Sequence, residues 1–121
     1  MFAIHHVQLA MPRGEEDSAR QFYVGLLGMH EAPKPPILAE RGGVWFRLDG
    51  LAIHLGVEDG FTPAKKAHPG ILTDELDALA ARLSTAGTEV TPDSALPGFR
   101  RFYVDDCFGN RLEFLERSEA E

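Results

Sequence analysis

Three histidines and one glutamate could together bind a metal ion or move a proton: His6, His54, His68 and Glu113. Each lies in a short segment that alternates apolar and polar residues, and each belongs to the polar set. Successive side chains of a strand point to opposite faces of its sheet, so burial of the apolar set turns these four to the other face. Imidazole and carboxylate groups gathered on one face are the usual donors of a divalent-metal site.

The alternation is clearest in LAIHLGV, where aliphatic residues share a phase opposite His54. The segment IHHVQLAM places His6 opposite an aliphatic set, and RLEFLER places Glu113 opposite a leucine and a phenylalanine. These patterns predict strands with one buried face.

Bulk properties restrict the classes of function. With 121 residues, 44% of them hydrophobic, the chain predicts one domain with its own core. The formal charge of −7 argues against nucleic acid as a partner, because phosphates repel an acidic surface. No apolar run approaches the roughly 20 residues that span a bilayer, and no signal peptide is recognisable. Cys107 is the only cysteine, which excludes an internal disulfide; we expect a cytoplasmic protein without a membrane partner.

The chain repeats itself weakly with a period of roughly 60 residues, which predicts two modules within one domain, at about 1–60 and 61–121. Each half begins with a strand that bears a histidine, an amphipathic helix follows, and the last strand bears His54 or Glu113. Two such modules packed about a pseudo-twofold axis would bring the four candidate residues together, although they are far apart in sequence.

The expected elements follow from apolar periodicity and turn residues. They are strands at 4–10, 37–40, 44–48, 51–57, 69–73, 88–91, 99–104 and 111–116, helices at about 15–27 and 74–86, and a hairpin turn at Asp49–Gly50.

The residues that carry a family resemblance are HVQL at 6–9, Ala19 with FY at 22–23 and LLGM at 26–29, His68 with DELD at 74–77, and FYVDD at 102–106 with FGNRLEF at 108–114. With them the chain resembles the vicinal oxygen chelate superfamily, which includes glyoxalase I, bleomycin-resistance and fosfomycin-resistance proteins, and extradiol dioxygenases. The resemblance covers residues 4–116, and the ending Asp-x-x-Gly-Asn-x-x-Glu is its most specific part. It implies an α+β fold in which paired βαβββ modules form a cupped, mixed, eight-stranded sheet with the helices outside.

The resemblance also implies one divalent ion, Zn, Ni, Mn or Fe, bound by His6, His68 and Glu113. In glyoxalase I a fourth ligand, a glutamate that also transfers protons, comes from the position that His54 occupies here. His54 could therefore be a direct ligand of the ion. It could instead be a base or a residue that contacts a ligand, or a solvent-facing histidine. Such an ion polarises neighbouring substrate oxygens, with His54 and Glu113 as the candidate catalytic residues.

Three further residues are predicted to contact a substrate. Arg101 and Tyr103 share a strand phase opposite Phe102, so both should face the cavity, where the guanidinium would bind a carboxylate or phosphate. The alternative for Arg101 is an internal ion pair, for instance with Glu113. Trp45 is expected as a cavity wall, with ordinary core packing as the alternative.

Two functions follow. The first is a metal-dependent, glyoxalase-like enzyme of lyase or isomerase type that acts on a small metabolite; a dioxygenase is less favoured, because extradiol enzymes usually carry two module pairs. The second is a metal-free protein of the bleomycin-resistance type that sequesters a small molecule or drug, in which the polar residues satisfy one another. The His/Glu set favours the enzyme, and in either case we expect a homodimer.

Overall fold

The computed structural model describes residues 1–118 and divides the chain into two compact units, Met1–Ala64 and Lys65–Glu121. Each unit is built from one mixed four-stranded sheet and the helical segment that follows its first strand. The fold is therefore α+β, with a βαβββ arrangement in each unit. No helix in the described range is long and apolar enough to cross a membrane.

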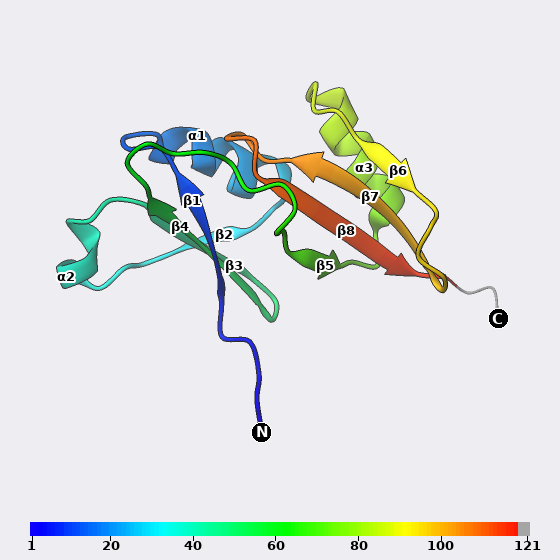
Figure 1. Ribbon diagram of the computed structural model, residues 1–121, viewed down its shortest axis with the longest axis horizontal. Helices are drawn as coiled ribbons and strands as arrows, with labels where there is room; N and C mark the ends of the chain where they lie inside the picture. The colour runs from blue at the N-terminus through cyan, green and yellow to red at the C-terminus, as the bar shows by residue number, and fades with distance from the viewer. Residues whose placement is uncertain (119–121) are drawn as a thin grey trace. The chain divides into compact units, whose positions relative to one another are not determined.

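The sheet of unit 1 has the strand order β1-β4-β3-β2, with β1 parallel to β4 and the other neighbours antiparallel (Figure 1). Its elements are β1 (Val7–Met11), α1 (Glu16–Arg20), the π-helical turn η1 (Gln21–Leu26), β2 (His30–Ala32), α2 (Pro36–Ala39), β3 (Val44–Leu48) and β4 (Leu51–Val57).

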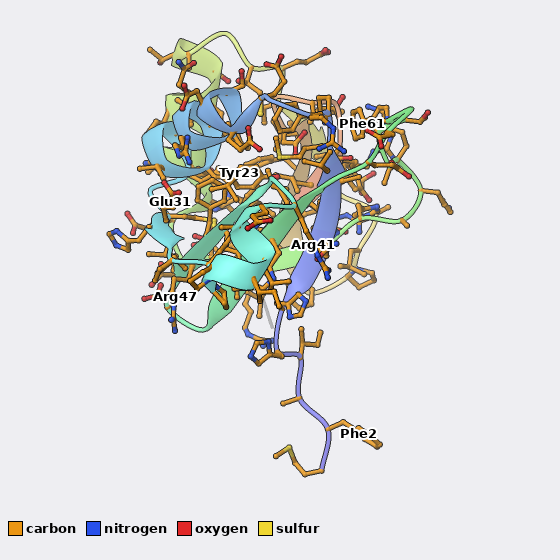
Figure 2. The ribbon with its side chains drawn as sticks, turned by 90° about the vertical axis from the view of Figure 1, so that its left-hand side faces the viewer. Phe2, Tyr23, Glu31, Arg41, Arg47 and Phe61 are labelled. Atoms are coloured by element: carbon orange, nitrogen blue, oxygen red, sulfur yellow. The ribbon has the colours of Figure 1, made fainter. Side chains whose placement is uncertain are left out.

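The core of unit 1 follows the predicted alternation. Its fully or nearly buried strand residues all lie on one face of the sheet: Leu9, Met11, Val44, Phe46, Ile53 and Leu55. Tyr23 of η1, which Figure 2 labels, is fully buried. Its ring stacks on that of Phe46, with ring centres 5.1 Å apart. The opposite face is left to the polar residues of the same strands.

Unit 2 has the equivalent strand order β5-β8-β7-β6 (Figure 1). Its elements are β5 (Gly70–Leu72), α3 (Leu76–Thr85), β6 (Thr91–Asp93), β7 (Phe99–Asp105) and β8 (Arg111–Arg117). The apolar stripe of α3 is buried, as are the residues of β7 and β8 that alternate with the polar set: Leu76, Leu79, Leu83, Phe102, Val104, Leu112 and Phe114.

The turn between β7 and β8 is built on two buried polar residues. The Oδ1 atom of Asp106 accepts hydrogen bonds from the backbone N–H groups of Phe108 and Asn110, each at 2.9 Å. The side-chain amide of Asn110 donates to Asp106 Oδ2 at 3.1 Å. This arrangement fixes the register in which Tyr103 faces Glu113, and a slip of one residue would turn every side chain of β8 to the other face.

Several predicted elements differ from the structure. The strand expected at 37–40 is the helix α2, because Pro36 suits the first turn of a helix and Ile37 stays 78% exposed instead of joining a sheet. The strand expected at 88–91 is shifted to β6, where Pro92 is tolerated because β6 is an edge strand. The short strand β2 was not expected at all.

Gly43 provides a test of the packing in unit 1. It has φ +87°, and a Cβ added there would overlap the carbonyl oxygen of Leu55. Gly60 has a similar φ of +69° with open space around it. We expect Gly60→Ala to lower the free energy of unfolding by about 1–2 kcal/mol through backbone strain, and Gly43→Ala by roughly 2–4 kcal/mol because overlap is added. Urea denaturation measures both, and equal losses would contradict the predicted overlap.

Candidate functional site

Unit 2 gathers a group of charged side chains on the polar face of its sheet. Glu113 of β8 is the centre of this group, with its side chain 11% exposed. Its Oε1 atom lies 2.9 Å from Nε2 of His68, and its Oε2 atom accepts a hydrogen bond from Nη1 of Arg101 at 2.9 Å. The sequence-predicted residues His68, Glu113 and Arg101 are therefore brought together within one unit.

The hydrogen bonds of His68 define which of its nitrogens is available. Nδ1 lies 3.0 Å from the carbonyl oxygen of Lys66 and 3.3 Å from that of Lys65. Carbonyl oxygens only accept, so Nδ1 carries the hydrogen, and a neutral ring then has a lone pair at Nε2. Two acceptors, this lone pair and the carboxylate of Glu113, repel each other at 2.9 Å. A proton or a metal ion must therefore lie between them.

Arg101 is held by carboxylates on both sides. Its Nη2 atom donates to Asp93 Oδ1 at 3.0 Å, and Nη1 donates to Glu113. The hydrogen bond to Glu113 is the main reason that the pKa of Arg101 is raised, with Asp93 adding to it. The pKa of Asp93 is lowered by the backbone N–H of Ala95 and then by Arg101. Arg101 therefore makes the ion pair with Glu113 that the sequence allowed, and its contact with a substrate stays a prediction.

Tyr103 is surrounded by cationic or potentially cationic groups. The guanidinium groups of Arg101 and Arg111 lie 5.3 and 5.5 Å from its ring centre, which is within cation–π range. The ring of His68 meets it edge-on at 5.6 Å. The tyrosine thus packs beside the His68–Glu113 contact, on the face where the alternation places it.

Unit 1 gathers a second group, three rings stacked in series. Trp45 of β3 and His54 of β4 are direct cross-strand partners, with ring centres 4.0 Å apart and planes 6° from parallel. His54 in turn stacks on His6, with centres 4.1 Å apart and an angle of 14°. Nδ1 of His6 lies 2.9 Å from Nδ1 of His5. We call Trp45, His54 and His6 the ring stack.

Burial is the main cause of a lowered pKa at His54, and repulsion from His6, His5 and Lys34 contributes further. The ammonium of Lys34 also lies 5.9 Å from the centre of the Trp45 ring. His54 is therefore a neutral imidazole at neutral pH, available as an acceptor or a base.

The question for a divalent ion is whether the residues of one unit supply enough ligands to bind it. Within neither unit do three histidine, cysteine or carboxylate side chains of the described range come close enough to share one. In unit 2, a backbone-anchored Nδ1–H that leaves Nε2 facing a carboxylate is typical of a metal-binding histidine. His68 and Glu113 therefore suit an ion as two of its ligands.

Sequence reasoning missed Asp93, which holds Arg101, and His5, which faces His6. The strand expected at 88–91 ends before Asp93, whereas Asp93 is the last residue of β6 and there pairs with Arg101. His5 lies on the opposite strand phase from His6, but β1 begins only at Val7, so strand alternation does not apply to either residue.

The family of the chain follows from comparison with known proteins. A family model described as the Glyoxalase/Bleomycin resistance protein/Dioxygenase superfamily matches residues 3–114. The chain belongs to this superfamily. It is 47% identical to a Bacillus anthracis protein assigned to the glyoxalase family, over 98% of this chain and 97% of that one, with a TM-score of 0.94. No curated protein matches.

More distant structures share the fold alone. A lactoylglutathione lyase from Agrobacterium tumefaciens is 20% identical, with 96% of this chain and 94% of that one covered and a TM-score of 0.72. An antibiotic-binding protein from a Streptomyces species is 24% identical, with 98% and 100% covered and the same TM-score. The same fold is thus found in a lyase and in an antibiotic-binding protein.

The environment of His54 predicts its titration. In ion-free protein we expect its NMR titration midpoint below the ordinary pKa of 6.5, moving upward in His6→Gln because a repelling group is removed. Because the unfolded chain binds this proton more readily, the contribution of His54 to the free energy of unfolding is intact above about pH 6.5 and decreases below it. A midpoint at or above 6.5 would contradict the partial burial of His54 and its repulsion by His6.

Proposed function

We propose that this protein is a metal-dependent, glyoxalase-like enzyme of lyase or isomerase type that acts on a small, oxygen-rich metabolite. His6, His68 and Glu113 bind one divalent ion, Zn, Ni, Mn or Fe. His54 is a further residue of the same functional site. Membership of the superfamily supports this assignment. The ion, when bound, polarises neighbouring oxygens of the substrate.

The observation that carries the proposal is the contact between Nε2 of His68 and Oε1 of Glu113. It joins two groups that both accept hydrogen bonds once Nδ1 carries the hydrogen. A partly buried pair of acceptors at this distance needs a positive charge between them. A bound metal ion would supply this charge, and the hydrogen bond from Nδ1 to the backbone would orient the ring as in known metal sites.

The other residues of unit 2 have roles that follow from their contacts. Arg101 occupies Oε2 of Glu113 and so leaves Oε1 as the oxygen that faces His68 and the ion. Asp93 fixes Arg101 from the neighbouring strand. Tyr103 forms a wall of the site and, with the exposed edge of Arg101, contacts the substrate. Trp45 has the corresponding role as a wall in unit 1.

A second function, metal-free sequestration of a small molecule, has one observation in its favour. Every buried side-chain nitrogen or oxygen in the described range has a hydrogen-bond partner. With a proton between His68 and Glu113, the charged group of unit 2 is satisfied without an ion. The two functions therefore differ in what lies between His68 and Glu113, a metal ion in the enzyme and a proton in the sequestering protein.

We also propose that the protein is a homodimer in the cytoplasm. The N-terminal residues Phe2 and Ile4 are 104% and 82% exposed, and the segment extends away from β1 (Figure 2). Apolar side chains presented in this way favour a protein partner. The single cysteine suits a reducing compartment.

Elemental analysis of the purified protein tests the enzyme proposal. We expect close to one equivalent of a divalent metal per chain, after reconstitution if necessary, and its loss in His6→Ala and in Glu113→Gln. Glutamine keeps the size of Glu113 and so preserves the fold. His30→Ala is the matched control, because His30 is an exposed histidine outside both groups. No metal in the wild type after reconstitution would favour sequestration.

The contact between His68 and Glu113 gives a second test. An ion that binds there displaces any proton held between the two groups, so metal binding should release protons from this position and affinity should rise with pH. Calorimetric titration with Zn²⁺ in two buffers of different ionisation enthalpy measures the release. His68→Gln should reduce it, whereas His30→Gln should leave it unchanged. Equal release in the His68 variant would show that the proton comes from elsewhere.

A further inference from the structure

The ring stack of unit 1 covers both faces of His54. Trp45 lies on one side at 4.0 Å and His6 on the other at 4.1 Å, and both neighbouring rings are within 14° of parallel to it. The imidazole of His54 cannot turn about its side-chain bonds without breaking both contacts. Cross-strand pairing with Trp45 fixes the position of its backbone as well.

This geometry bears on which imidazole can bind an ion. A metal lies close to the plane of a ligating imidazole, at about 2.0–2.1 Å from the nitrogen. The rings of His54 and His6 lie in nearly parallel planes, stacked with centres 4.1 Å apart. An ion in the plane of one ring is therefore well outside coordination distance from the nitrogens of the other. The two residues cannot bind the same ion as they are arranged.

His6 has the nitrogen that is free for this purpose. Its Nδ1 faces Nδ1 of His5 at 2.9 Å, and its Nε2 has no hydrogen-bond partner in the part of the chain that the structure describes. His6 precedes the first strand, so no backbone ladder holds it. The contacts that orient its ring are the stack on His54 and the hydrogen bond to His5.

We infer that His54 and Trp45 are positioning residues, which hold the imidazole of His6 by ring stacking, and that His54 is not a ligand of the ion that His6 binds. The inference rests on the proposed function for the ion and goes beyond it in assigning these roles. It departs from the four-ligand pattern that the resemblance to glyoxalase I implies. In this protein the fourth position becomes the middle ring of the stack.

Substitutions that separate stacking from coordination test the inference. His54→Phe keeps a planar ring but has no nitrogen, and His54→Ala removes both. Trp45→Phe and Trp45→Ala form a matched pair on a residue that cannot bind the ion. The dissociation constants of Zn²⁺ and Ni²⁺ are measured by calorimetry, and urea denaturation checks that each variant folds.

We expect His54→Phe and Trp45→Phe to bind each ion within about threefold of the wild type. His54→Ala and Trp45→Ala should bind more weakly, by roughly 10- to 100-fold, as is usual when a ligand loses its support. If His54→Phe loses the ion as fully as His6→Ala does, while Trp45→Ala binds normally, His54 is a ligand and the inference is overturned.

A readout without metal separates this inference from the proposed function. Ring protons of His6 should be displaced upfield by stacking in ion-free wild type and in His54→Phe, and should approach the values of free histidine in His54→Ala. Wild type that binds neither ion overturns the proposed function, and these shifts then decide whether the stack positions His6. Shifts that do not change in His54→Ala overturn the inference.

Discussion

The register between β7 and β8 is the constraint on which the charged group of unit 2 depends. Two buried residues, Asp106 and Asn110, close the turn with side-chain and backbone hydrogen bonds. The turn sets Tyr103 opposite Glu113 and leaves Leu112 and Phe114 in the core. Because strand side chains alternate, the position of one carboxylate is fixed by the burial of its two apolar neighbours.

The charges around that carboxylate are arranged as a chain. Asp93, Arg101 and Glu113 alternate in sign across β6, β7 and β8, and His68 follows after Glu113. The three fixed charges sum to minus one, so a positive charge at His68 neutralises the group. A proton between His68 and Glu113 would do so, whereas a divalent ion would leave a net positive charge that favours an anionic or oxygen-rich ligand.

The sequence predicted the faces of the strands better than the contacts made on them. Burial of the alternating apolar residues of β4 and β8 determined where His54 and Glu113 point, and the Asp-Gly and Asp-x-x-Gly-Asn turns marked the hairpins. The stacking of Trp45 on His54 depends on pairing between β3 and β4, and the bond from Asp93 to Arg101 depends on pairing between β6 and β7. Both are decided by register between strands, which no local pattern contains. The prediction of a strand at 37–40 was wrong, because Pro36 favours the first turn of a helix and the alternation of apolar and polar residues there is short.

The ring stack also gives the protein an intrinsic optical probe. Trp45 is the only tryptophan in the chain, and one ring separates it from His6. Indole emission responds to the rings and charges in contact with it, so all of the fluorescence excited at the red edge originates at this position. The emission of Trp45 would therefore report an ion or small molecule that binds beside His6, without any added label. Collections of metabolites or drugs could be screened in this way on the unmodified polypeptide.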